Sequence, residues 1–489
     1  MLTTFTAPAF AKTWYIENGD ITISAGKTEG TNKVSQGSTT DEEDTDTVIT
    51  NNNRDTASSH TVTIDAGNDK VEVTLKDVNI KADSGSALTS NGDVTLTLKG
   101  ENHLTGGNGD IYGGDGITSS GSLTISGGTV TATGGNNTGS DGSGGSGIYS
   151  VSGSVTISGG TVNATGGEGS KNNSTSGGSG IYSDSGDVTI SGGTVNANGG
   201  NGGTISGGDG ICSSGGVTIS SGSTVTANGG SGEDGSGGRG ITSNGGVTVS
   251  GGTVNAKGGS GKNGNGGDGI LSFNPVAISG GTVKSNGGSG NLSGGNGIIS
   301  YDIDLSGSLE LTAKAGSPNG KALSRAGKEL DLNTIKDKLG PGAKVTVTDA
   351  NGKVNQVSIP RPVEPEEPVI PEESSSSSDG GSATSSAPAS PFPGLTVTDK
   401  DGQRISYTST QSGNTLTVCV GRFTAFLRAS LSTLRQLRAE GIDTITFQTI
   451  LCSTTLSVDE LLAMGGEDAE VVLTHHIRSS TLTVGGKAV

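Results

Sequence analysis

Apolar and polar residues alternate with a period of two in short groups along the central part of the chain. In "GIYSVSGSVTISGGTVNATGG" (147–167) the apolar positions of three such groups are Ile148, Val155, Ile157, Val162 and Ala164. This alternation predicts β-strands, because successive side chains of a strand point to opposite faces. Gly-Gly and Ser-Gly pairs separate the groups and predict tight corners between three short strands.

The same unit returns at nearly constant intervals. A Gly-Ile pair opens each copy, and its isoleucine stands at positions 117, 148, 181, 211, 241, 270 and 298, at spacings of 28 to 33 residues. Weaker copies at Ala87-Leu88 and Ala322-Leu323 extend the series. Three strands of this length cannot form a free-standing sheet, but stacked identical units can bury their apolar sides.

We therefore expect an all-β fold, a parallel β-helix in which each unit of about 30 residues closes one coil. The right-handed form is expected, since parallel crossover connections strongly prefer that hand. The isoleucines, valines and alanines should stack into internal columns. The segment after each "TVxAxGG", for example 136–145 and 168–178, varies in length and is therefore expected to loop outward from one corner.

Changes in composition divide the chain into four parts. Ala9-Phe10-Ala11 resembles a signal-peptidase site, so residues 1–11 are expected to be a signal-peptide remnant. Residues 12–359 form the β-helix with a C-terminal cap, which includes a short helix expected near 334–339. Residues 360–394 are a linker rich in proline, glutamate and serine.

Residues 395–489 lose the repeat and predict a small α+β domain. Thr424 is expected to cap a helix over 425–439, and Ser457 with Glu460 predicts a capping box for a second, short helix. Cys419 and Cys452 either pair in an exported protein or remain two buried thiols.

Composition and charge exclude several classes of function. Glycine supplies 90 of the 489 residues and aromatic residues only 3%, which favours a thin core of small repeated units. The formal net charge of −18 argues against nucleic-acid binding, which needs a positive surface. No apolar stretch is long enough for a membrane helix, and three cysteines cannot build a disulfide framework.

Two tyrosines are candidate carbohydrate-binding residues. Tyr149 and Tyr182 occupy the same outward position on adjacent coils, and stacked aromatic rings offer a flat apolar face to a sugar. The alternative is a ladder that only shields the sheet. The column is not a uniform platform, because it continues as Thr118, Cys212, Thr242, Leu271 and Ile299.

A second set of residues lies two positions before the repeated isoleucines. There Arg239 stands between Asp209 and Asp268, which predicts a charge ladder. The alternative is calcium, whose preferred ligands are carboxylate and carbonyl oxygens. The calcium candidates are Asp115, Asp141, Asp209, Asp234 and Asp268.

Catalysis is not expected. Cleavage of a polysaccharide by hydrolysis needs paired carboxylates, and residues 116–300 contain no Asp-Asp pair, no histidine and a single arginine, Arg239.

The run "VTIDAGNDKVEVTLKDVNIKADSGSALTSNGDVTLTLKGENHLTGG" (62–107), followed by "GDGITSSGSLTISGGTVTATGG", resembles a bacterial carbohydrate-binding β-helix family whose members bind polygalacturonate and calcium. The resemblance covers roughly residues 12–330. It implies export, a β-helix similar to that of pectate lyases, and binding of acidic plant polysaccharide without cleavage. No ligand motif of the family is matched position by position, so it assigns no site residue.

The expected function is therefore that of an exported, non-catalytic polysaccharide-binding protein, secreted or held at the cell surface, with calcium as cofactor and polygalacturonate as partner. The alternative is a bacterial surface adhesin or structural stalk that displays its loops and its C-terminal domain and makes cell-surface or cell-wall contacts.

Overall fold

The computed structural model describes residues 11–360 except 172, and residues 394–488 except 400–402, 406, 413, 421, 423, 450–452, 465–468, 477–478 and 486. The chain divides into two compact units, residues 1–366 and 367–489, with the division inside the expected linker. The expected signal-peptide remnant, up to residue 10, and linker residues 361–393 lie outside the described residues.

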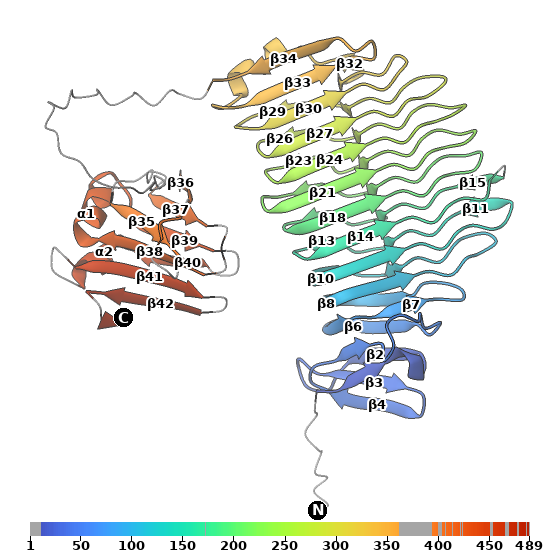
Figure 1. Cartoon of the computed structure of the whole chain (residues 1–489), viewed down its shortest axis with the longest axis horizontal. Coiled ribbons are helices and arrows are strands. Elements are labelled where there is room, and N and C mark those ends of the chain that lie inside the picture. The colour runs from blue at the N-terminus through green and yellow to red at the C-terminus, as the bar shows by residue number, and fades with distance from the viewer. Residues whose placement is uncertain are drawn as a thin grey trace, which may run out of the picture. The chain divides into compact units, whose positions relative to one another are not determined.

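The first unit is the β-helix that the repeat predicts, with about 12 turns of about 29 residues (Figure 1). Each central turn has three short strands, and each strand pairs in parallel with its equivalents in the neighbouring turns, so that the stack has three faces. The first face consists of β9 (Ile117–Ser119), β12 (Ile148–Ser150), β16 (Ile181–Ser183), β19 (Ile211–Ser213), β22 (Ile241–Ser243), β25 (Ile270–Ser272), β28 (Ile298–Ser300) and β31 (Leu323–Arg325).

The other two faces share the long strand β10 (Leu123–Thr133), which turns the corner between them. The second face continues as β13 (Val155–Ile157), β17 (Val188–Ile190), β20 (Val217–Ile219), β23 (Val247–Val249), β26 (Val276–Ile278) and β29 (Ile303–Leu305). The third face continues as β14 (Thr161–Thr165), β18 (Gly193–Asn198), β21 (Ser223–Asn228), β24 (Thr253–Lys257), β27 (Thr282–Asn286), β30 (Glu310–Lys314) and β33 (Lys344–Thr348).

Identical apolar residues stack in register inside the coil. Ile148 pairs with Ile181, which pairs in turn with Ile211, and all three side chains are fully buried. Val162 and Val195 continue the same arrangement on the third face. The expected internal columns are therefore confirmed, and each buried aliphatic side chain contributes about 1.5–3 kcal/mol to folding.

Antiparallel strands close the N-terminal end. The first turns use β1 (Thr13–Tyr15), β5 (Val48–Thr50), β6 (Val62–Lys76), β7 (Asn79–Lys81) and β8 (Leu88–Thr105), while β2 (Ile21–Ala25) pairs antiparallel with β3 (Asn32–Gln36), and β3 with β4 (Thr39–Asp44). The sequence of β4 ends in four acidic residues, 41–44. Charges on an edge strand oppose pairing with another chain.

The C-terminal end is closed by β32 (Lys328–Glu329) and β34 (Val354–Ser358), which pair antiparallel with β31 and β33. The short helix expected near 334–339 is present only as two 3-10 turns, Leu332–Thr334 and Lys336–Lys338. The Asp331 carboxylate caps the first turn by accepting the N–H of Asn333, and Pro341 prevents a helix from continuing past Gly340.

The variable segments leave the coil at one corner, between the third face and the next first face, as expected. They also stack on one another, which the sequence pattern does not predict. The strand β11 (Asp141–Ser143) pairs with β15 (Ser174–Ser176), and successive bridges join Gly202, Gly232, Gly261 and Gly290. We call this stack the loop fin; it is seen in Figure 1 as the row of long loops beside the strands.

A glycine neck joins the fin to the coil. Glycines stand where the chain leaves the coil and where it returns, and outgoing and returning glycines alternate in one series of hydrogen bonds. The N–H of Gly145 donates to the carbonyl of Gly135, that of Gly167 to Gly145 and that of Gly178 to Gly167. The series continues through Gly200, Gly208, Gly230, Gly238, Gly259, Gly267, Gly288, Gly295 and Gly316, with N···O distances of 2.7 to 2.9 Å throughout. A Cβ at these positions would fall far inside van der Waals contact with a neighbouring carbonyl oxygen, so only glycine fits.

The second unit is an α+β domain, as predicted. One antiparallel sheet holds β35 (Leu395–Thr398), β38 (Ala425–Ser430), β41 (Glu470–His476), β42 (Ser479–Val484) and β43 (Lys487–Ala488). The other sheet holds β36 (Thr408–Ser412), β37 (Thr415–Cys419), β39 (Thr444–Gln448) and β40 (Ser453–Ser457), with β37 and β39 parallel. The helices are α1 (Leu431–Ala439) and α2 (Val458–Ala463).

The prediction of a helix over 425–439, capped by Thr424, is wrong for its first six residues. Residues 425–430 form β38, in which Ala425, Leu427 and Ala429 are buried with a period of two, and the helix begins only at Leu431. Its cap is Ser430, whose Oγ accepts the N–H of Thr433 at 3.1 Å. The capping box is confirmed in part, since the Oγ of Ser457 accepts the N–H of Glu460.

His475 is fully buried in this unit. Its ring nitrogens lie 2.9 Å from the Thr454 hydroxyl and 3.2 Å from the Thr449 hydroxyl, and its ring centroid lies 4.7 Å from that of Phe447. Burial lowers the pKa of His475, because the charged imidazolium loses its hydration there.

Gly178→Ala is expected to destabilise the β-helix by about 1–3 kcal/mol, because its new Cβ collides with the carbonyl of Gly145 across the neck. Gly159→Ala is the matched control, since no described residue other than its two chain neighbours comes within 4 Å of a Cβ there. Thermal unfolding measures both variants, and equal midpoints would contradict a neck that requires glycine.

The stability of the second unit is expected to fall as the pH drops through about 6.5, the ordinary pKa of histidine. The pKa of His475 is lower in the folded chain than in the unfolded chain, so below this pH the unfolded chain binds a proton that the folded chain does not. The free energy of unfolding therefore decreases. Urea midpoints at pH 7.5 and 5.5 should differ more in the natural chain than in His475→Gln; the same difference in both would rule out His475 as the cause.

Candidate functional site

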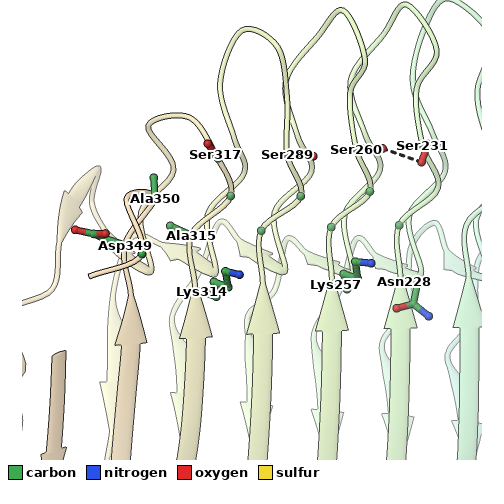
Figure 2. Close-up of a pocket in the computed structure, with 17 residues that line it drawn as sticks. Asn228, Ser231, Lys257, Ser260, Ser289, Lys314, Ala315, Ser317, Asp349 and Ala350 are labelled. Carbon is green, nitrogen blue, oxygen red and sulfur yellow. Dashed lines mark hydrogen bonds between the residues drawn. The ribbon is translucent and has the colours of Figure 1, made fainter. Parts of the chain in front are cut away.

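An open groove of about 810 Å³ runs along the coil axis where the third face meets the glycine neck. Figure 2 shows its side chains in a row across successive turns. The groove is lined by Asn228, Gly229, Ser231, Lys257, Gly258, Gly259, Ser260, Gly287, Gly288, Ser289, Lys314, Ala315, Gly316, Ser317, Asp349, Ala350 and Gly352. Ligand sites in proteins commonly have volumes of about 300–1,000 Å³.

The groove repeats its chemistry from turn to turn. On one side, the strand ends present Asn228, Lys257 and Lys314; on the other, the first residue of the fin is a serine in each of four turns: Ser231, Ser260, Ser289 and Ser317. The Ser231 and Ser260 hydroxyl oxygens lie 3.1 Å apart. Because neighbouring turns are about 4.8 Å apart, the groove offers serine hydroxyls at regular intervals, with ammonium groups opposite them in the turns of Lys257 and Lys314.

Three lysines on the third face stand out among the cations of the central turns. Residues 106–316 contain six basic side chains: Lys171, Arg239, Lys257, Lys262, Lys284 and Lys314. Lys262 pairs with Glu233 at 2.9 Å, and Arg239 lies 3.8 Å from Asp268. Lys257, Lys284 and Lys314 are exposed and form no ion pair with any residue that the structure describes.

These three lysines form one stripe on the outward side of the third face. Lys257 and Lys314 share a register position with Asn286 between them, and Lys284 lies on the intervening strand, two residues before Asn286. We call them the lysine stripe. This stripe was not predicted from the sequence, although the signal was present: all three lysines fall at outward positions of the third strand in successive units.

The tyrosine pair predicted from the sequence is present on the first face. Tyr149 and Tyr182 are in register, with ring centroids 5.2 Å apart and ring planes 13° from parallel. The Tyr182 hydroxyl donates to Asp184 Oδ1 at 2.6 Å, and burial together with Asp184 raises the pKa of Tyr182. Stacking covers one face of each ring, which favours the shielding alternative over an open sugar platform.

Three of the predicted carboxylates, Asp115, Asp209 and Asp268, stand in one column beside the neck. Each accepts the backbone N–H of the next turn, from Ser146 at 2.6 Å, Arg239 at 2.7 Å and Asn296 at 2.6 Å respectively. Burial raises the pKa of Asp115 and of Asp209. Each carboxylate therefore fastens one turn to the next.

The remaining two candidates lie on the fin and are exposed. Asp234 accepts the Asn263 side-chain amide at 2.6 Å, and Asp141 accepts the Ser140 hydroxyl at 3.3 Å. Among the described residues, no group of three or more histidine, cysteine, aspartate or glutamate side chains is placed to hold a metal ion. The structure thus does not gather the five carboxylates, and calcium binding stays a prediction.

Comparisons with protein-family models, with characterised proteins and with solved structures give no match. The structure itself shows a parallel β-helix with an axial polar groove beside three lysines that form no ion pair with the described residues. The resemblance to the polygalacturonate-binding family stays a prediction. In the part of the chain that the structure describes, no helix has the length and apolarity needed to cross a bilayer.

Cys212 follows Tyr182 in the first-face column and is a free thiol, as is Cys419 in the second unit; Cys452 lies outside the described residues. Burial, reinforced by Asp209, raises the pKa of Cys212 to about 12.

In a Cys419→Ser, Cys452→Ser background, alkylation of Cys212 by iodoacetamide at pH 8 is expected to be slower by about tenfold or more than in urea, because the thiolate is the reactive form. Equal rates in the folded and unfolded chain would contradict this placement of Cys212.

Proposed function

We propose that this protein is an exported, non-catalytic polysaccharide-binding β-helix that holds an acidic glycan along the groove of the third face. The observation that carries this proposal is the lysine stripe, two of whose members, Lys257 and Lys314, line an 810 Å³ groove with serine hydroxyls along its other side.

The ligand follows from the chemistry of the groove. An ammonium on a flexible stem attracts carboxylates without demanding one fixed geometry, which suits the uronate groups of a sugar polymer. The serine hydroxyls and Asn228 can donate to and accept from sugar hydroxyls. The chain carries a net charge of −18 and as a whole repels a polyanion. Binding of a polyanion is therefore favoured at the lysine stripe, where the exposed charges are positive.

Calcium would act on the other side of the neck. Asp115, Asp209 and Asp268 lie there in one column, but calcium takes about six to eight oxygen ligands. The bound glycan and water would supply most of those ligands. The lysine stripe needs no metal, so a chelator separates the two modes of binding.

The groove is suited to holding a chain rather than cleaving it. Asp349 is the one carboxylate among its lining residues, and its Oδ1 accepts the N–H groups of Asn351 and Lys353 at 2.9 and 2.8 Å. Hydrolysis by the usual route needs a second carboxyl group across the scissile bond.

A surface adhesin or stalk remains the second candidate. The observation that favours it is the loop fin, an ordered stack that would display its loops at regular intervals, together with a separate second unit. An adhesin of this kind would be indifferent to acidic glycans.

The variant Lys257→Gln, Lys284→Gln, Lys314→Gln is expected to bind polygalacturonate more weakly by about tenfold, since three exposed charge contacts contribute about 0.5 kcal/mol each. Affinity electrophoresis with the polymer in the gel measures the loss. The expected loss persists in chelator, whereas any calcium-dependent part of the retardation disappears.

The matched control is Lys76→Gln, Lys99→Gln, Lys171→Gln, which removes the same charge from exposed positions outside the groove. It should migrate like the natural chain. Retardation that is lost equally in both variants, or in neither, would refute a role for the lysine stripe, and no retardation of the natural chain would favour the adhesin.

A further inference from the structure

The groove has a definite beginning. In its turns, the residue after the neck glycines is Ser231, Ser260, Ser289 or Ser317, but the preceding turns carry the larger Asn136, Glu168 and Asn201 at this position. Asn201 Nδ2 donates to Glu168 Oε1 at 3.2 Å, and Asn201 Oδ1 accepts the N–H of Ser231 at 2.9 Å. Bonded side chains thus occupy the line along which the groove would continue, and one of them is a carboxylate.

The groove also has a definite end. After β33 the chain does not leave for the fin but folds back into β34 through the turn 349–353. The Asp349 N–H donates to the Lys353 carbonyl, and the Asp349 carbonyl accepts the N–H of Gly352, both at 3.0 Å, in addition to the two hydrogen bonds that its carboxylate accepts. Figure 2 shows Asp349 and Ala350 beside Ala315, at the end of the row of turns.

This turn lines the groove at its last turn, and we call it the wall. Asp349, Ala350 and Gly352 are among the lining residues, and Gly352 has a φ of +84°, a left-handed conformation that favours glycine. The wall is made largely of backbone that is already hydrogen-bonded within the turn, so it has little freedom to move aside for a passing chain.

The length of the groove and the charges along it are consistent with a short site that is closed at one end. Ser231 and Ser317 are three turns apart, which corresponds to about 14 Å. Lys314 is one turn from the wall, and Glu168 at the opposite end repels an anionic chain that extends over it. Attraction is therefore concentrated between Asn201 and the wall.

We infer that the groove captures the terminus of an acidic glycan chain, with the last sugars lying against the 349–353 turn, rather than an internal stretch of the polymer. This inference rests on the proposed function, since it names the part of the glycan that the same groove recognises. A chain on the groove floor must end where the wall stands, and at the other end it can rise away over Asn201.

The test compares long polygalacturonate with short oligomers made from it, with the full chain and in chelator. End capture predicts half-saturation at equal concentrations of chain ends, so that shortening the chains lowers the mass required in proportion. Half-saturation at equal uronate mass for long chains and for oligomers would overturn the inference.

Blocked ends provide a second arm. Oligomers with a bulky group on the reducing end and oligomers with one on the non-reducing end are titrated separately, and one of the two should lose binding. That outcome also assigns which terminus meets the wall; undiminished binding of both blocked oligomers would overturn end capture.

A pair of variants tests the wall itself. Ala350→Trp places a large side chain at the closed end and should weaken oligomer binding, whereas Asn351→Trp alters the same turn at an exposed residue that does not line the groove and should leave binding unchanged. Equal affinities of the two variants and the natural chain would overturn the role of the wall.

The two proposals fail differently. If neither polymer nor oligomer binds, the proposed function and end capture both fall. If binding depends on the lysine stripe but follows uronate mass and tolerates both blocked ends, end capture alone falls and the groove remains a glycan site.

Discussion

The close approach of backbone to backbone at the glycine neck is the constraint on which the first unit depends. Outgoing and returning segments alternate in one hydrogen-bond ladder, and each N–H reaches the carbonyl of a glycine on the neighbouring segment. No side chain fits between them. The neck therefore lets each turn carry a loop of variable length while the three strands of the coil keep a nearly constant repeat.

The neck also separates two surfaces of opposite character. On the third-face side lie the lysine stripe and the groove; on the first-face side lie the Asp115, Asp209 and Asp268 carboxylates, each used to bond the next turn. Register makes both patterns possible, because a residue at one outward position recurs about every 4.8 Å along the axis. A single substitution in one repeat thus changes one step of a regular array.

Much of the fold could be predicted from the sequence because strands with a period of two return at intervals of about 30 residues. The Tyr149–Tyr182 stack followed from the same register. The ordered stacking of the fin could not be predicted, since glycine-rich segments carry no apolar period. The sequence of residues 425–430 is compatible with either a helix or a strand. These residues form a strand because they pair with β35 and β41 in the folded domain. The positions of the lysine stripe could have been predicted from the outward places of its lysines in three successive units. That these lysines form no ion pair could not, because pairing depends on neighbours that only the folded chain brings together.

Regular stacking at the neck builds one axial groove, and we propose that an acidic glycan lies in it. Amide hydrogen exchange of the full chain, with and without an acidic oligosaccharide, tests it most directly. If the glycan lies in the groove, added protection is confined to the segments around 228–231, 257–260, 287–289, 314–317 and 349–352. Protection centred instead on the first face around Tyr149 and Tyr182, or on the fin alone, would contradict it.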